Sequence, residues 1–224
     1  MAKPEDEEAG SPACLMHLID PVSGTLPPDG DRQQWIDVRR WRKAERERLT
    51  ALRVAIPAEE RRRHSRSIAE ELDRVLGDIS GRIVSVYWPI RGEPDLRGWM
   101  EGLAERGAMC ALPVVVQPRT PLVFRAWRRG DPLEPGIWNI PTPLEGPDVT
   151  PDVVLAPVVG FDRPCYRLGH GGGFFDRTLA VLSPRPRIVG VGYARLAIPT
   201  IFPQAHDIPM DLVVTEEGTV TASE

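Results

Sequence analysis

Lysine is nearly absent from this chain of 224 residues. Its basic residues number 28, and all of them except Lys3 and Lys43 are arginines. Lys3 lies among acidic residues close to the N-terminus, so a function that needs a lysine within the fold must use Lys43. Arginine is not an equivalent replacement, because a planar guanidinium and a compact ammonium group favour different partners and geometries.

Cysteines and long apolar runs are also scarce. The three cysteines, Cys14, Cys110 and Cys165, form no C-x-x-C pair, which excludes a disulfide framework and argues against a structural zinc site. No run approaches the ~20 apolar residues of a membrane span, and residues 1–8 lack the apolar stretch of a secretory signal. We therefore expect a cytoplasmic protein that does not enter a membrane.

The formal net charge of -4 conceals three unequal segments. The net charge is -6 over residues 1–38, +7 over residues 39–66 and -5 over residues 67–224. Residues 1–31 are acidic, contain proline and glycine and have no hydrophobic period. Such a composition predicts a mobile N-terminal tail.

The body of the chain is predicted to be one α/β domain over residues 32–217, followed by a short tail over 218–224. Helices are predicted at residues 33–54, from Pro57 onward, at 95–106 and at 173–182. Strands are predicted at residues 83–88, 109–115, 122–127, 153–156, 188–193 and 212–215. Several of these strands are apolar without alternation, as in buried parallel strands. The alternating helices favour a three-layer sandwich with a largely parallel sheet, and such sheets bind ligands beyond the carboxyl ends of their strands.

The segment from Arg167 to Arg177 is the most informative part of the sequence. Its glycines, Gly169 and Gly171 to Gly173, let backbone N–H groups approach an anion, and the predicted helix that follows directs its positive end to the same place. The flanking arginines suit phosphate oxygens, and Asp176 suits a magnesium ion bound to them. The segment therefore indicates a phosphate site.

Two better-known phosphate motifs do not fit this segment. A Walker A loop needs Gly-Lys-Ser or Gly-Lys-Thr, and the dinucleotide fingerprint needs a glycine where Phe174 stands. Glycine richness alone also fits a simple tight turn. The flanking arginines and Asp176 favour the anion site.

The loop Arg167-Leu-Gly-His-Gly-Gly-Gly-Phe-Phe-Asp-Arg177 resembles the R-L-G-x-G-G-G-F/Y-Y-D-R loop of 5-formyltetrahydrofolate cyclo-ligases, also called methenyltetrahydrofolate synthetases. The resemblance covers about Arg39 to Glu217 and includes, in the family's order, a basic N-terminal helix, Ala58-Glu-Glu-Arg61, residues 87–95, 151–157 and 206–216. It implies a fold similar to the sugar-isomerase and CoA-transferase-like group. It also implies ATP- and magnesium-dependent closure of 5-formyltetrahydrofolate to 5,10-methenyltetrahydrofolate, in which phosphorylation turns the formyl oxygen into a leaving group.

By this resemblance, the ATP phosphates are held by the glycine loop and by cations of the first helix. The loop residues are Arg167, Leu168, Gly169, His170, Gly171, Gly172, Gly173, Phe174 and Phe175. An ungapped alignment puts Arg42 where the family usually has its ATP-binding lysine and Arg46 at the following arginine, with Lys43 one residue away. Asp176 and Asp207 match the expected magnesium ligands. Arg167, Phe175 and Asp176 are the candidate catalytic residues.

The resemblance also assigns a folate site. Glu93 matches the folate-binding glutamate, whose carboxylate accepts hydrogen bonds from pterin N–H groups, although a solvated loop acid is the alternative. Trp88 and Phe174 are candidates to contact the pterin, and Trp138 is expected in the core or pocket wall. His170 is expected to be an ordinary loop histidine.

Two departures from the family pattern keep other functions open. Phe175 lacks the hydroxyl of the usual tyrosine, and the lysine is displaced by one position, so a paralogue with another substrate or no cyclo-ligase activity is an alternative. The +7 segment suggests a nucleic-acid-binding module as a further alternative, but Glu45, Glu47, Glu59 and Glu60 interrupt it. The leading hypothesis is an enzyme that uses ATP, magnesium and a reduced folate and binds neither nucleic acid nor membrane. The oligomeric state is left open.

Overall fold

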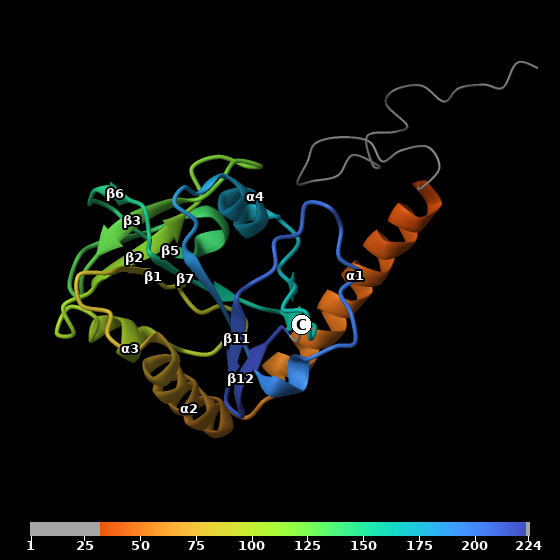
Figure 1. The fold of residues 1–224 in the computed structure, drawn as a ribbon, viewed down its shortest axis with the longest axis horizontal. Coiled ribbons are helices and arrows are strands. Elements are labelled where there is room, and N and C mark those ends of the chain that lie inside the picture. The colour runs from red at the N-terminus through yellow and green to blue at the C-terminus, as the bar shows by residue number, and fades with distance from the viewer. Residues whose placement is uncertain (1–31, 223–224) are drawn as a thin grey trace, which may run out of the picture.

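The computed structural model describes residues 32–222, so the predicted tail over residues 1–31 lies outside the described residues (Figure 1). Two long helices come first, α1 (Arg32–Val54) and α2 (Ala58–Leu76). Pro57 precedes α2 with an extended backbone, and Glu59 and Glu60 occupy the first turn, where acidic groups stabilise the positive end of a helix. Helix α1 agrees with the predicted span 33–54 to within one residue, and α2 begins one residue after the predicted start at Pro57.

An eight-stranded sheet forms the centre of the molecule, in the order β12-β11-β10-β7-β1-β2-β3-β6. The strands from β11 to β2 are parallel to one another, while β3, β6 and β12 pair antiparallel at the two edges. Their bounds are β1 (Ile83–Ser85), β2 (Met109–Val114), β3 (Val123–Trp127), β6 (Asp148–Val149), β7 (Val153–Pro157), β10 (Arg187–Val191), β11 (Leu212–Thr215) and β12 (Gly218–Thr221). The predicted α/β fold with a largely parallel sheet is confirmed. The three-layer order and the likeness to the sugar-isomerase group stay predictions.

The central strands are buried on both faces, which explains their apolar runs. All four residues of β11 are buried, as are the first four of β7 and the last four of β10. Two smaller hairpins, β4 (Leu133–Pro135) with β5 (Pro141–Pro143) and β8 (Gly160–Phe161) with β9 (Arg167–Leu168), lie outside the main sheet.

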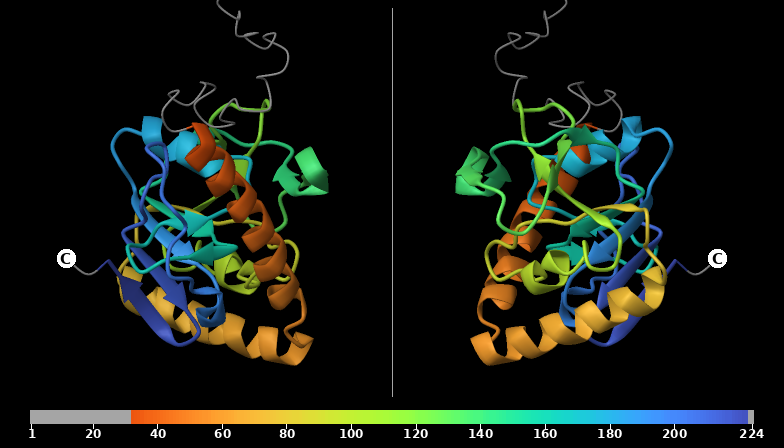
Figure 2. Two further views of the ribbon diagram at one scale, coloured as in Figure 1. Left: turned by 90° about the vertical axis from the view of Figure 1, so that its right-hand side faces the viewer. Right: turned by 90° about the vertical axis from the view of Figure 1, so that its left-hand side faces the viewer.

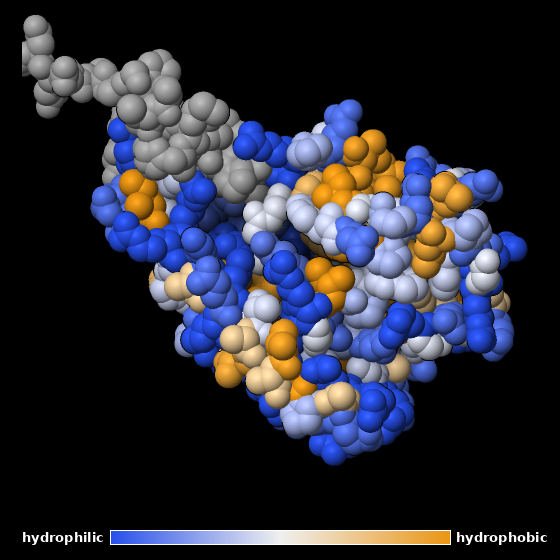
Figure 3. All heavy atoms as spheres, turned by 180° about the vertical axis from the view of Figure 1, so that it is seen from behind, coloured by the Kyte–Doolittle hydropathy of each residue, from blue (hydrophilic) through white to orange (hydrophobic). Residues whose placement is uncertain are grey.

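The helices are distributed around the sheet. Helix α4 (Phe174–Val181) and the start of α1 lie at one end of the molecule, and α2 lies at the other end (Figure 2). The outer surface of α1 is mostly hydrophilic, as the view from behind shows (Figure 3). Within residues 32–222, no helix is long and apolar enough to cross a membrane.

Three local predictions differ from the structure. The helix predicted at residues 95–106 is only α3 (Arg97–Glu101), because Gly102 ends it and turns continue to Gly107. The strand predicted at residues 83–88 ends at Ser85 as β1. The tail predicted from residue 218 is wrong for Gly218–Thr221, which form β12 against β11. Gly218, with φ of 122°, provides the left-handed conformation that this tight turn requires.

Candidate active site

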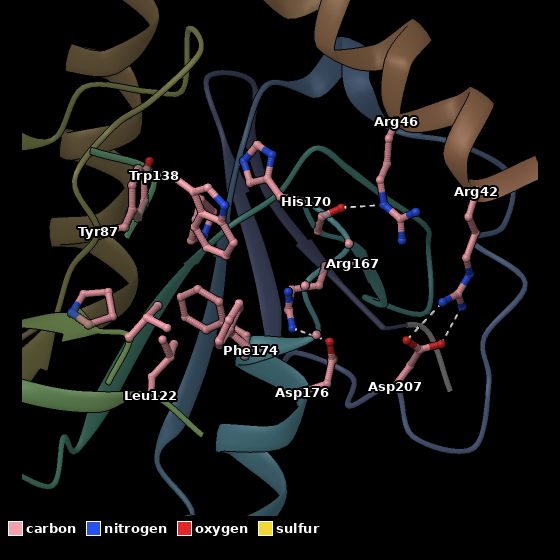
Figure 4. Close-up of a pocket in the computed structure, with 18 of the residues that line it drawn as sticks. Arg42, Arg46, Tyr87, Leu122, Trp138, Arg167, His170, Phe174, Asp176 and Asp207 are labelled. Atoms are coloured by element: carbon pink, nitrogen blue, oxygen red, sulfur yellow. Dashed lines mark hydrogen bonds and ion pairs between the residues drawn. The ribbon is translucent and has the colours of Figure 1, made fainter. Parts of the chain in front are cut away.

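A cavity of about 590 Å³ lies beyond the carboxyl ends of β1, β2 and β7 (Figure 4). Its charged side consists of Arg42, Arg46, Arg167, Asp176 and Asp207. Its apolar side consists of Tyr87, Leu122, Trp138 and Phe174. The glycine loop contributes to the wall of the same cavity, so segments that are far apart in the sequence meet there.

Arg42 connects α1 to the loop over residues 201–207. The residue is only 8% exposed. Its Nε donates to the Ile201 carbonyl oxygen at 2.9 Å, its Nη2 donates to the Phe202 carbonyl oxygen at 2.9 Å, and the same Nη2 lies 2.5 Å from Asp207 Oδ2. The guanidinium is therefore committed to holding this loop against the helix.

Lys43, the adjacent residue, has a different environment. Its side chain is exposed and lines the same cavity. Arg42 is thus engaged by protein groups, whereas the adjacent Lys43 is an exposed residue of the cavity wall.

Arg46 contacts the glycine loop from above. Its Nε donates to the Gly169 carbonyl oxygen at 2.8 Å, and a Cβ on Gly171 would lie 3.5 Å from its Cζ. Burial, and then the neighbouring charge of Arg42, lower the pKa of Arg46 to about 10. The guanidinium remains protonated at neutral pH and adds positive charge beside the loop.

The glycine loop leads directly into α4. Gly173, at φ of 63°, occupies the left-handed region immediately before the helix, so the N–H groups of its first turn are available to an anion. Leu168, which was predicted among the ATP-binding residues of the loop, is 1% exposed, and its side chain packs in the core beside β9. The alternation of a strand places Arg167 and Gly169 toward the cavity and Leu168 away from it.

The predicted catalytic residues Arg167, Phe175 and Asp176 are close together. Arg167 Nη2 lies 2.8 Å from Asp176 Oδ2, and the Arg167 guanidinium lies over the Phe175 ring, with Cζ 5.0 Å from its centroid. Asp176 Oδ1 also accepts from the Ile208 N–H at 3.3 Å. Phe175 thus supports the arginine as an aromatic surface and supplies no hydroxyl.

The two predicted magnesium ligands, Asp176 and Asp207, line the same cavity, and each is paired with an arginine. Within residues 32–222, no group of three or more His, Cys, Asp or Glu side chains is arranged to hold a metal ion. A site built entirely from protein ligands is therefore not present in this part of the chain. Two carboxylates do suit magnesium, which usually takes one or two carboxylates together with substrate phosphates and water.

Glu93 is buried, so the alternative of a solvated loop acid is wrong. The residue is 5% exposed. Its Oε2 accepts from the Ile90 N–H at 2.9 Å, and its Oε1 lies 2.8 Å from His170 Nε2. The Arg53 guanidinium, 3.7 Å from Oε1, supplies the positive charge that a buried carboxylate requires.

Aromatic residues complete the cavity on the apolar side. Trp88 lines it, as predicted, and forms an edge contact with Trp127 at 6.4 Å between ring centroids. Trp138 is 67% exposed and lies edge-on to Phe174 at 5.5 Å, at the rim of the cavity. It adopts a left-handed backbone with φ of 57° in the turn between β4 and β5.

Two residues of this side, Tyr87 and Leu122, were not among the predicted site residues. Tyr87 lies in the segment 87–95 that resembles the family, and Leu122 begins a predicted strand. Trp138 was expected in the core or pocket wall, and the structure places it in the wall of the cavity and not in the core. The prolines on both sides of Trp138 in the sequence indicate that this residue lies in a loop.

Comparisons with known proteins agree with this arrangement. Residues 38–216 match the 5-formyltetrahydrofolate cyclo-ligase family, and the chain belongs to that family. The 5-formyltetrahydrofolate cyclo-ligase of Mycolicibacterium smegmatis is 32% identical over 152 residues, which cover 64% of this chain and 78% of that protein. The cyclo-ligase of Haemophilus influenzae is 26% identical over 180 residues, which cover 75% of this chain and 95% of that protein.

Solved structures have the same fold. The NMR structure of Aquifex aeolicus 5,10-methenyltetrahydrofolate synthetase matches with a TM-score of 0.71 and 28% identity, covering 82% of this chain and 93% of that one. The synthetase of Mycoplasma pneumoniae matches with a TM-score of 0.66 and 22% identity, covering 78% of this chain and 98% of that one. The family confirms the resemblance found in the sequence, and with it come cyclo-ligase activity in folate one-carbon metabolism and the use of ATP.

Proposed function

We propose that the cavity carries out this activity by binding ATP on its charged side and 5-formyltetrahydrofolate on its apolar side. The observation that supports the proposal most directly is that one cavity combines a cationic glycine loop with a buried, charge-compensated carboxylate, Glu93. The first feature suits phosphates and the second suits pterin N–H groups. An enzyme that transfers a phosphoryl group from ATP to a formyl oxygen needs both next to each other.

The ATP phosphates have a matching electrostatic environment. Six basic side chains and three acidic ones line the cavity: Arg39, Arg40, Arg42, Lys43, Arg46 and Arg167 against Glu93, Asp176 and Asp207. The phosphates lie against the loop Gly169 to Gly173 and the start of α4, with Arg46 and Arg167 beside them. Lys43 replaces the usual family lysine, since Arg42 already holds the loop over residues 201–207.

Asp176 and Asp207 are the residues that hold magnesium in this proposal. Magnesium held by these two carboxylates would supply positive charge to offset the charge that develops during phosphoryl transfer. The pairing of each carboxylate with an arginine keeps these side chains oriented toward the cavity. Arg167 can then contact the transferring phosphoryl group, and its buried Nε has no hydrogen-bond partner within residues 32–222.

The folate lies against the apolar side. Glu93 Oε2 accepts one hydrogen bond, from the Ile90 N–H, and retains a lone pair for pterin N–H groups, while Oε1 contacts both His170 and Arg53. Phe174 and Trp138 cover the flat ring, which removes apolar area from water. The formyl group is then directed to the charged side, where its oxygen receives the phosphoryl group before the neighbouring folate nitrogen closes the ring and phosphate leaves.

The decisive experiment is an assay of the purified chain with 5-formyltetrahydrofolate and Mg-ATP, following methenyl product and released phosphate. We expect both in equal amounts, and none when ATP or magnesium is omitted. A folded protein that binds ATP and forms no methenyl product would instead support the paralogue, for which the missing hydroxyl at Phe175 is the specific observation.

The nucleic-acid alternative has less support. Arg42 and Arg53 are buried, while Arg48 pairs with Glu45 and Arg62 with Glu59. The +7 segment therefore does not present all its charge as one surface. Retention on DNA or RNA that weakens steeply with salt would revive this alternative.

A further inference from the structure

His170 connects the two substrate sites. Its backbone belongs to the glycine loop, between Gly169, which accepts from Arg46, and Gly171, which lies against the same arginine. Its ring lies on the side of the cavity toward Trp138 (Figure 4). Its Nε2 lies 2.8 Å from Glu93 Oε1. One residue of the proposed nucleotide loop thus contacts the carboxylate of the proposed folate site, although the two are 77 positions apart in sequence.

The carboxylate at the other end of this contact is held in place. Glu93 Oε2 accepts from the Ile90 N–H at 2.9 Å, and Arg53 Nη1 lies 3.7 Å from Oε1. Arg53 is itself fully buried, and its Nε donates to the Arg91 carbonyl oxygen at 3.0 Å. His170 is the exception, since its side chain is 34% exposed while that of Glu93 is 2% exposed. A change in the conformation of the glycine loop can therefore form or break the contact between His170 and Glu93.

We propose that His170 is a positioning residue that couples nucleotide binding to folate binding. Phosphates that order the loop also restrict the His170 backbone, so the imidazole stays on Glu93 Oε1 and the carboxylate keeps the orientation that the pterin needs. Folate that engages Glu93 restrains the loop in the same way, because a coupling free energy between two sites acts equally in both directions. The inference rests on the proposed locations of both substrates.

Equilibrium titration of the full-length chain with 5-formyltetrahydrofolate tests this coupling, with and without saturating magnesium and a non-hydrolysable ATP analogue. The quantity compared is the ratio of the two folate dissociation constants. We expect the analogue to tighten folate binding by about fivefold or more in the wild type. His170→Ala should bring the ratio close to one, whereas His170→Gln, which retains a side-chain N–H donor, should restore most of it.

Two controls separate coupling from general damage. His64→Ala removes a histidine that lines a different cavity and should keep the wild-type ratio. Thermal melting should show that His170→Ala is folded, as expected for a partly exposed loop residue. Nucleotide affinity, measured with and without folate, should change by the same factor as folate affinity.

Several results would overturn the inference. A wild-type ratio of one, or a His170→Ala ratio equal to that of the wild type, excludes coupling through this residue. If His170→Ala weakens folate binding by the same factor with and without nucleotide, His170 only supports Glu93 locally. That result also contradicts the inference. Failure of the proposed function is distinguishable, because the wild type itself would then bind no folate or yield no methenyl product.

Discussion

On the charged side of the cavity, Arg42, Arg46 and Arg167 each already contact a carboxylate or a carbonyl oxygen, whereas on the apolar side the ring of Trp138 is 67% exposed. The difference follows from what burial demands of each kind of group. A buried charge needs a partner before any ligand arrives, while an aromatic ring at a cavity rim tolerates water until a ligand covers it. The charged side is thus organised in advance, and the apolar side is completed by its ligand.

This comparison predicts two kinds of mutational effect. Changes on the charged side should alter both stability and chemistry, because they leave a buried partner uncompensated. Changes on the apolar side should alter folate binding in proportion to the lost contact area and leave the fold intact.

Asp176→Asn should reduce kcat/KM about 100-fold or more, the range found when a group that stabilises transferring charge is removed. The amide can still accept from the Ile208 N–H, so the domain should remain folded. Calorimetric titration with Mg-ATP should show weaker, less magnesium-dependent binding. The exposed acid Asp148 offers a matched control, since Asp148→Asn should change neither quantity. Unchanged Mg-ATP affinity in Asp176→Asn would remove this residue from the site.

Arg42→Ala should lower the free energy of unfolding by about 3–5 kcal/mol, because it leaves Asp207 buried without its partner. Lys43→Ala should change stability by less than about 0.5 kcal/mol, as is usual for an exposed residue. It should instead raise the ATP dissociation constant about tenfold, the loss of one charged contact to phosphate. Chemical denaturation and ATP titration of both variants measure the difference. The reverse pattern would show that Arg42 is the phosphate ligand.

Glu93→Gln should weaken folate binding about 10- to 100-fold, because a neutral amide replaces a charged acceptor for pterin N–H groups. ATP affinity in the absence of folate should stay close to that of the wild type. The measurement is folate titration by protein fluorescence together with ATP titration. A variant that loses both affinities equally would indicate a general disturbance of the cavity and contradict the assignment.

Trp138→Ala should weaken folate binding about tenfold, which corresponds roughly to the binding free energy expected from the apolar contact area that the truncation removes. Its exposure means that the melting temperature should hardly change. The exposed Val181, on the outside of α4, gives a control in Val181→Ala. If Trp138→Ala is markedly less stable yet binds folate normally, the ring belongs to the core and not to the site.

Phe175→Tyr should have the smallest effect, a change in kcat of about two- to threefold, which corresponds to well under 1 kcal/mol. The ring keeps its position beneath the Arg167 guanidinium, and the added hydroxyl restores only the family's usual group. Steady-state kinetics of the two proteins measure the change. A gain of 100-fold or more would mean that Phe175 had suppressed cyclo-ligase activity, which would favour the paralogue.

Much of the fold follows from local patterns. Both ends of α1 and α4 and the start of α2 lie within one residue of their predicted positions, because glycine, proline and apolar spacing act over a single turn. Continuous apolar runs predicted buried parallel strands such as β7 and β10, and the structure confirms them. By contrast, β12 was missed because its polar residues take up strand conformation only when β11 offers an edge.

The site divides in the same way. The phosphate loop was recognisable in the sequence because its chemistry lies within eleven consecutive residues, from Arg167 to Arg177. The sequence did not show which of Arg42 and Lys43 faces a ligand. Adjacent helical residues point in directions about 100° apart, so an alignment error of one residue assigns the side chain to another face of the helix. Burial of Glu93 and its contact to His170 depend on two loops that only the folded sheet brings together.

The sequence by itself therefore determined the family, the helices, the parallel strands and the loop that suits phosphate, since each is encoded in residues that are neighbours along the chain. The tertiary structure alone decided that Arg42 holds a loop while Lys43 lines the cavity, that Trp138 lies at the rim, and that His170 reaches Glu93. These outcomes depend on which segments far apart in the sequence come into contact and which side chains they bury. A local sequence pattern contains information about neither.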